Sequence, residues 1–384
     1  MSTSTDQPAY HRTWRDENTG REVHQLTRTG DTQRPFLPYF MTWKHLSDGR
    51  LLIGNPTQNR ILDFFSGEIT SLPGIGRAFQ IAPDGSRIYC WDDTSRRVIA
   101  LSIPDLHAEP FGQTLDPQFP ATANLRITAD GRYLIAEIIH EHPKSKAGFY
   151  GSDAAAVWQV LNRPRRGELW TCDLSTGQSN RLIHLEDHGI IYTDPSPTDP
   201  DLIKFCHDQW EGHCQRIWTI PTNGGEPRPV RPQSRGEIVT HDIWWPDGRY
   251  IAYSYQDRRG DPTIQQNPWA EYAAADMRFG LAHPHGPEAY LSDPLGHWHS
   301  HINVSRDGSR ICGEGTHDYP FLCAADFSID RTRIDFIPQA SIHTPYASVA
   351  GHGLQADFTA DGRWLLYHDT VDNEHHICAV RVEL

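Results

Sequence analysis

The sequence predicts an all-β protein that folds as a seven-bladed β-propeller with four-stranded blades. Three observations support this prediction: a repeated unit built around an Asp-Gly turn, a further pair of strands after each unit, and incomplete units at the two ends. The 384 residues exceed an average domain, but a closed all-β architecture reaches this length. We therefore expect residues 1–384 to form a single domain.

The repeated unit is a short apolar segment, an Asp-Gly turn and an alternating strand. Six copies read KHLSDGRLLIG, QIAPDGSRIYC, RITADGRYLIAE, IWWPDGRYIAYSY, INVSRDGSRICGE and DFTADGRWLLYHD. A seventh and degenerate copy, PSPTDPDLIKFCHD, lies between the third and the fourth of these. Asp-Gly supplies the positive φ angles of a tight hairpin, and alternating apolar residues mark half-buried strands. Seven copies therefore predict seven blades.

The second half of each unit and the chain ends complete the ring. The segments STGQ and TNGG, in ELWTCDLSTGQSNRLI and RIWTIPTNGGEPRPV, are further hairpin turns, which makes four strands per unit. The segment GREVHQLT, within residues 20–30, is expected to be the outermost strand of the last blade, which otherwise ends at HHICAVRVEL. Such closure leaves few exposed edges. A two-sheet sandwich is the alternative, but it does not explain regular repetition along the whole chain.

Composition excludes some classes of function and predicts a location. The net charge of −14 argues against nucleic-acid binding, which needs a basic surface. The N-terminus lacks the features of a signal peptide, and no stretch of about 18 apolar residues occurs, so we expect a cytoplasmic protein without membrane contact. The seven cysteines are scattered and never spaced as C-x-x-C, which favours reduced, buried thiols.

The repeat places side chains from different blades at one height of the central channel. The strand before each Asp-Gly turn is the innermost of its blade, so residues six positions before each Asp are equivalent. These residues are Thr42, Ala78, Asn124, His241, His301 and Gln355. Three consecutive blades thus present two imidazoles and an amide, which suit a divalent ion such as Mn²⁺, with zinc and calcium as alternatives. None of these ligands is anionic, so the ion would keep its charge for a substrate carboxylate.

Further histidines and basic residues are expected near this level. His299 lies two residues before His301 and is expected on the same strand face, while His352 lies at the entrance to the last inner strand. His297 is expected to be an ordinary loop residue. The segment CHDQWEGHCQRIW lies in a loop that opens on this face of the ring and brings His207, His213 and Arg216 towards it.

An insertion at residues 139–167 is expected on the same face. It carries the basic residues Lys144, Lys146, Arg163, Arg165 and Arg166. Local positive charge on an acidic protein suits an anionic ligand, although a solvated loop is the alternative for these side chains.

The motifs FCHDQWEGHCQRIW, THDIWWPDG, SHINVSRDGS and DFTADG resemble those of the oligogalacturonate lyases, seven-bladed propellers of polysaccharide lyase family 22. The resemblance covers nearly the whole chain, although the Asp-Gly motifs are shared with TolB-type propellers. It implies that His241 is the Brønsted base, Arg216 the active-site arginine and His301 a manganese ligand. In the last blade the family has a Gln followed by two alternating histidines, whereas this chain reads AGHGLQADF.

The altered last blade leaves His352 and Gln355 as the expected ligands beside His301, with His299 or His343 as further ones. His207 and His299 are expected to contact the substrate. The implied activity is that of a metal-dependent carbon-oxygen lyase in pectin degradation. It would cleave short anionic oligouronides by β-elimination to 4-deoxy-5-keto-uronate products.

Two other functions compete with a lyase. A non-catalytic propeller of TolB or WD40 type would bind a protein or peptide, but such a scaffold would fill the His241, His301 and Gln355 level with small or apolar residues. The propeller of a serine peptidase is disfavoured because the chain has no G-x-S-x-G motif and no room for a hydrolase domain.

Overall fold

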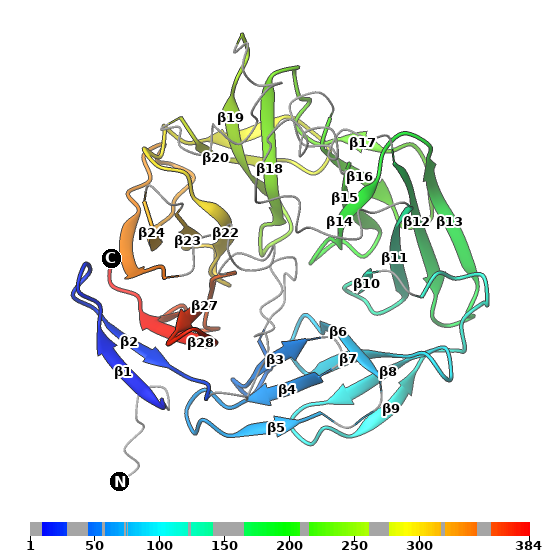
Figure 1. Cartoon of the computed structure of the whole chain (residues 1–384). Helices are drawn as coiled ribbons and strands as arrows, with labels where there is room; N and C mark the ends of the chain where they lie inside the picture. Colours follow the sequence, from blue (N-terminus) through cyan, green and yellow to red (C-terminus); the bar gives the residue numbers. More distant parts are fainter. Residues whose placement is uncertain are drawn as a thin grey trace.

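The computed structural model describes most of the chain. The described residues are 10–28, 45–55, 58–72, 74, 76–121, 124–140, 165–207, 215–260, 276–315, 319–343 and 355–384. Seven antiparallel sheets are arranged in a ring around a central channel (Figure 1). The predicted all-β, seven-bladed propeller is confirmed. Within the described residues, no helix has the length and apolar character needed to cross a lipid bilayer.

We number the blades 1 to 7 in chain order. Blade 1 contains β3 (Leu51–Asn55), β4 (Gln58–Leu62) and β5 (Ile69–Ser71). Blade 2 contains β6 (Arg77–Ile81), β7 (Arg87–Asp92), β8 (Arg97–Ser102) and β9 (Ala108–Phe111). Blade 3 contains β10 (Asn124–Ile127), β11 (Tyr133–His140), β12 (Arg166–Asp173) and β13 (Ser179–Leu185). Blade 4 contains β14 (Ile190–Pro195), β15 (Leu202–His207), β16 (Ile217–Pro221) and β17 (Arg228–Pro229).

The remaining blades follow the same order from the channel outwards. Blade 5 contains β18 (Glu237–Trp244), β19 (Ile251–Asp257), β20 (Arg278–Ala282) and β21 (Glu288–Leu291). Blade 6 contains β22 (Ser300–Val304), β23 (Arg310–Glu314), β24 (Phe321–Asp326) and β25 (Ile337–Ser341). Blade 7 contains β26 (Asp357–Phe358), β27 (Trp364–Val371) and β28 (Glu374–Arg381), and is completed by β2 (Glu22–Gln25) and β1 (Arg12–Arg15).

Blades 1 and 7 differ from the expected four strands. Blade 1 shows three strands because most of its expected innermost strand falls in residues 29–44, outside the described residues; an isolated bridge joins His45 to Leu51. Blade 7 has five strands because β1 pairs with the outer edge of β2. Strand β1 was not among the strands predicted from the sequence.

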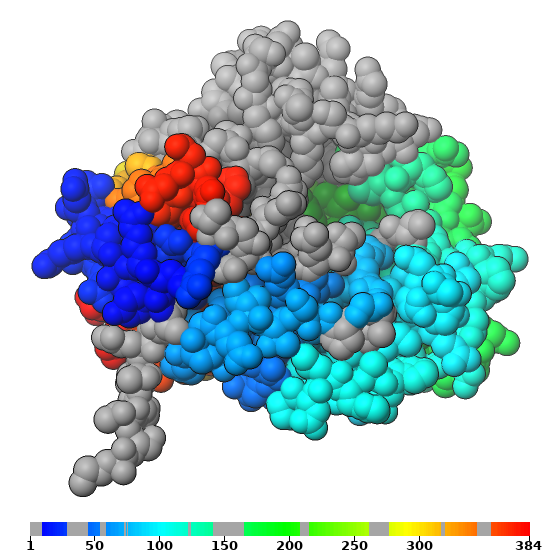
Figure 2. Space-filling model, turned by 60° about the horizontal axis from the view of Figure 1, so that its bottom comes forward, coloured from blue at the N-terminus to red at the C-terminus, as the bar shows by residue number. Residues whose placement is uncertain are grey.

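The chain ends close the ring as predicted. Strand β2 pairs antiparallel with β28, with Val23 opposite Val380 and Gln25 opposite Cys378. The peptide N–H of Leu26 extends this ladder by donating to the carbonyl of Ile377 at 2.8 Å. In Figure 2 the N-terminal strands (blue) lie directly against the C-terminal blade (red). This pairing leaves no free edge on β28, which would otherwise be open to aggregation.

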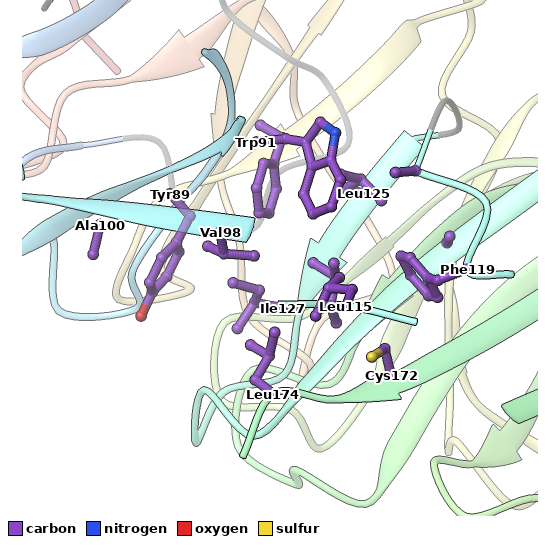
Figure 3. Packing of buried hydrophobic residues seen from close by; sticks show 14 of the residues in the cluster. Tyr89, Trp91, Val98, Ala100, Leu115, Phe119, Leu125, Ile127, Cys172 and Leu174 are labelled. Carbon is purple, nitrogen blue, oxygen red and sulfur yellow. The ribbon is translucent and has the colours of Figure 1, made fainter. Parts of the chain in front are cut away.

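Apolar side chains that alternate along the strands fill the space between neighbouring blades. Trp91 and Val98 of blade 2 pack with Leu125 and Cys172 of blade 3, and each is at most 1% exposed (Figure 3). Six cysteines in the described residues are free and buried, as the sequence predicted for them. These inter-blade cores fix the rotation of each blade against the next, so side chains at equivalent register positions meet in the channel.

A chain that starts at residue 29 would lack β1 and β2 and should be markedly less stable. Val23 and Leu26 are each 1% exposed, and their loss alone should lower the free energy of unfolding by about 3–6 kcal/mol. Urea unfolding of the shortened and full-length chains measures the difference. Arg12→Ala is the control, because its ion pair with Asp372 is exposed and should contribute less than about 1 kcal/mol. Equal stability of the shortened and full-length chains would contradict the closure model.

Candidate active site

Four adjacent blades share one backbone irregularity in their innermost segment. Tyr192, His241, His301 and Gln355 have positive φ angles of 55°, 52°, 43° and 50°. The strand register shifts at this point in blades 4, 5 and 6, as a β-bulge requires. Left-handed backbone is unfavourable for residues with a Cβ, and such strain and bulges cluster at functional sites, where they redirect side chains. The predicted equivalence of His241, His301 and Gln355 is thus visible in the backbone.

Tyr192 also has this left-handed backbone, but the sequence pattern did not predict it as an equivalent residue. It lies four residues before Ser196, whose N–H closes the turn on the carbonyl of Leu202 at 2.9 Å. Trp245 closes the turn on Tyr250 in the same way, four residues after His241. The degenerate fourth copy has a longer turn without Asp-Gly, so the six-residue count does not reach Tyr192.

His241 and His301 face each other across the boundary of blades 5 and 6. Their ring centroids are 4.9 Å apart, with the rings at 68°, and Trp298 packs against His241 at 6.3 Å. Burial and then the charge of Arg216 lower the pKa of His241 to about 3, although Asp242 opposes both effects. His241 is therefore neutral at pH 7, the form that accepts a proton.

His301 is held by a buried carboxylate. Its Nδ1 contacts Oε1 of Glu314, which lies on β23 and is 1% exposed. A carboxylate at Nδ1 favours the tautomer that carries its proton there, which leaves the lone pair on Nε2. A carboxylate that orients the ring in this way is typical of histidines that ligate metals. Glu314 was not identified from the sequence.

The donor types at this level fit a divalent cation with nitrogen and oxygen ligands. His301 offers an imidazole and Gln355 an amide oxygen. Blades 6 and 7 are tied at this level because the Asn303 amide donates to the carbonyl of Ala356 at 2.6 Å. The third expected ligand, His352, lies outside the described residues. Within the described residues, no group of three or more His, Cys, Asp or Glu is placed to hold a metal.

The structure brings Arg216 to His241 although the two residues belong to different blades. Arg216 directly precedes β16 and is 2% exposed. Its Nε lies 3.6 Å from Oδ1 of Asp242, and its guanidinium carbon lies 5.5 Å from the ring centroid of Tyr192. A cation is thus fixed beside the neutral base, which suits an anionic ligand.

A buried ion pair between Lys204 and Asp242 lies behind these groups. The Lys204 ammonium donates to Oδ2 of Asp242 at 2.5 Å, and the side chains are 2% and 0% exposed. Burial alone would lower the pKa of Lys204, but the charge of Asp242 outweighs burial and raises it. Burial raises the pKa of Asp242, but Lys204 and Arg216 together lower it. Both groups are therefore ionised at pH 7.

Neither Lys204 nor Asp242 was among the predicted site residues. The available signal was a lysine in the middle of the apolar strand LIKFC, since a buried lysine needs a partner.

His207 and His299 are expected substrate contacts, and both rings are largely enclosed. His207, at the end of β15, packs between His188 and Trp218 at centroid distances of 4.5 and 5.2 Å. Burial and then the neighbouring His188 lower its pKa to about 4. His299 is 1% exposed and stacks on Phe336 at 4.1 Å. Their contact with substrate stays a prediction.

The expectation that His299 shares a strand face with His301 is wrong. The positive φ of His301 and the bulge between Ser300 and Asn303 break the alternation of the strand. The His299 ring therefore stacks on Phe336 in the packing beside blade 5, and the peptide N–H of His299 donates to Sδ of Met277 at 2.9 Å.

Two other histidines occupy ordinary surroundings. His297 stacks on Tyr319 at 3.8 Å, and Nδ1 of His343 lies 2.8 Å from the buried carboxylate of Asp369. A metal-binding role for His343 stays a prediction.

Several residues named from the sequence lie outside the described residues: Thr42, Lys144, Lys146, Arg163, His213 and His352. The flanks of the 139–167 insertion are described, and His140 of β11 pairs with Arg166 of β12.

Comparison with known proteins supports the resemblance seen in the motifs. No protein-family model matches the chain. An oligogalacturonate lyase of Dickeya dadantii (strain 3937) is 30% identical over 82 residues, which span 21% of this chain and 21% of that relative. The matched region is thus about a fifth of the relative's length.

Two solved structures are similar over almost the full chain. An oligogalacturonate lyase in complex with manganese has a TM-score of 0.74 and 20% identity, covering 98% of this chain and 97% of that one. An oligogalacturonate lyase from Vibrio parahaemolyticus has a TM-score of 0.71 and 17% identity, covering 97% and 96%. These likenesses confirm the propeller fold, and the sequence match confirms the resemblance to oligogalacturonate lyases.

The left-handed backbone at Gln355 can be tested by the stability of two variants. Gln355→Gly should be more stable than Gln355→Ala by about 1 kcal/mol, because glycine adopts positive φ without the Cβ clash. Urea unfolding of both variants measures the difference. Thr370, on the regular strand β27, is the matched control, and there the alanine variant should be the more stable. The same order at both positions would argue against a left-handed Gln355.

Proposed function

We propose that this protein is a lyase that cleaves short uronides by β-elimination. The observation that carries the proposal is the convergence of neutral His241, His301 and the cation Arg216 at one level of the channel. A base, a histidine in a ligand-like environment and a carboxylate-binding arginine are the groups that this reaction needs. The similarity to oligogalacturonate lyases supports galacturonate as the sugar.

The proposed reaction begins with a proton transfer to His241. The neutral imidazole takes the proton at C5, next to the uronate carboxylate, and the C–H electron pair forms the C4=C5 double bond. The C4–O bond breaks, and the departing oxygen takes the bonding electron pair and a proton from solvent, while the protonated His241 returns its proton to solvent. Arg216 binds the carboxylate through its planar guanidinium and so stabilises the charge that develops there. No water attacks the sugar, which separates this reaction from glycoside hydrolysis.

His301, Gln355 and His352 would hold a divalent cation in this proposal. We favour Mn²⁺ because a structurally similar lyase was solved in complex with manganese. When bound, such an ion supplies positive charge for the substrate carboxylate and so favours loss of the weakly acidic C5 proton. The role of Glu314 is to orient the His301 ring.

Digalacturonate is the proposed test substrate. Cleavage would release galacturonate and an unsaturated unit that rearranges to 4-deoxy-5-keto-uronate.

A cytoplasmic location is also part of the proposal. The six buried free thiols of the described residues are consistent with a reducing compartment.

His241→Ala should abolish turnover of digalacturonate while leaving the fold intact. Removal of a general base typically costs about 10²–10⁴-fold in rate. Product formation is followed by the ultraviolet absorbance of the unsaturated unit, and folding by circular dichroism. His297→Ala is the control, because its ring stacks on Tyr319 away from the His241–His301 pair. Full activity of the His241 variant would rule out its role as base.

Removal of divalent metal should also stop the reaction. Treatment with a chelator followed by dialysis should reduce turnover to background, and added Mn²⁺ should restore it, because carboxylate charge would otherwise oppose proton loss. The His301→Ala variant should bind less Mn²⁺ in equilibrium dialysis than the wild type. Undiminished turnover after complete metal removal would refute the metal requirement.

A further inference from the structure

We propose that Lys204 and Asp242 are positioning residues that set the relative placement of Arg216, His241 and Tyr192. This inference rests on the proposed function, because it concerns the same site. Neither residue needs to touch the substrate: both act through the groups that do.

Lys204 ties the bulges of two blades together. It lies on β15, the second strand of blade 4, and is 2% exposed. Its ammonium donates to Oδ2 of Asp242 at 2.5 Å, to the carbonyl of Tyr192 at 3.0 Å and to the carbonyl of Asp242 at 3.4 Å. Tyr192 and His241 are the left-handed residues of blades 4 and 5, and Asp242 directly follows His241. The three donors of one ammonium thus hold both irregular segments in register.

Asp242 connects these hydrogen bonds of Lys204 to Arg216. Its second oxygen, Oδ1, accepts from Sγ of Cys206 at 2.9 Å and faces Nε of Arg216 at 3.6 Å. One buried carboxylate is therefore shared between two cations, and the closer cation is Lys204. Lys204 lies closer to Asp242 than Arg216 does, so the Arg216 guanidinium faces this carboxylate at the longer distance of 3.6 Å. The pair of Lys204 and Asp242 thus sets where Arg216 lies beside His241.

Two links between blades at this level use neutral side chains and no ion pair. Gln80 of blade 2 exchanges hydrogen bonds with the backbone of Ile127 in blade 3 at 2.6 and 3.0 Å. The Asn303 side-chain amide joins blades 6 and 7 through a hydrogen bond to the carbonyl of Ala356. Both side chains are neutral. A buried ion pair is seldom more stabilising than an apolar replacement, so its presence beside Arg216 points to placement of charge rather than to stability.

The kinetic test compares Lys204→Met, the double variant Lys204→Met/Asp242→Asn and the control Gln80→Ala on digalacturonate with Mn²⁺. Lys204→Met should lower kcat/KM about 100-fold, mostly through kcat, because misplacement of about 1 Å costs that much. The double variant also removes the carboxylate that faces Arg216, so it should not regain the lost kcat. Gln80→Ala breaks an equivalent inter-blade link far from Arg216 and should lower the melting temperature while leaving kcat unchanged.

Recovery of both stability and kcat in the double variant would overturn the proposal, since it would make the pair purely structural. If Lys204→Met alone does not fold, the double variant carries the kinetic comparison.

A second measurement does not depend on turnover. In a crystal structure of Lys204→Met, Nε of Arg216 should close on Asp242 from 3.6 Å to a hydrogen-bond distance of about 2.9 Å, and the Tyr192 carbonyl should move. Unchanged positions of both groups would refute the inference. If the wild type cleaves no uronide, the proposed function fails, but this structural comparison still decides whether Lys204 positions Arg216.

Discussion

The antiparallel pairing of β2 with β28 is the constraint on which the rest of the molecule depends. The strands within the other blades are neighbours in sequence, whereas this pairing joins the two ends of the chain. Without it the blades could splay, because each inter-blade core needs a neighbour on both sides. Closure fixes the diameter of the channel, and thereby fixes which side chains from blades 4 to 7 meet.

Strain is distributed unevenly around this ring. Tyr192, His241, His301 and Gln355 have left-handed backbone, whereas the equivalent Ala78 and Asn124 do not. Each such residue costs about 1–3 kcal/mol, which the packing between blades must offset. A ring built only for stability would not repeat this cost in four adjacent blades. This strain lies on the side of the channel where we propose the active site.

Charge is distributed unevenly as well. The whole chain carries a net charge of −14, yet beside His241 two buried cations, Arg216 and Lys204, share one carboxylate, Asp242. Burial of these charges is costly unless they are paired in good geometry. Burial and then the charge of Arg216 lower the pKa of His241, and the two cations favour an anionic ligand. A neutral imidazole beside a cation is the combination that the proposed reaction uses.

The sequence by itself determined the strands, the seven blades, the closure and the common level of His241, His301 and Gln355. Asp-Gly turns and period-two alternation are local properties, so counting from a turn locates equivalent residues without knowledge of their neighbours. Only the tertiary structure decided the fifth strand of blade 7, the place of Tyr192 and the packing of the His299 ring between blades. It also decided the partners of Lys204 and Asp242, because a side chain's direction at a bulge and its ionic partner depend on the adjacent blade. That contact joins residues far apart in the chain, and no local pattern records it.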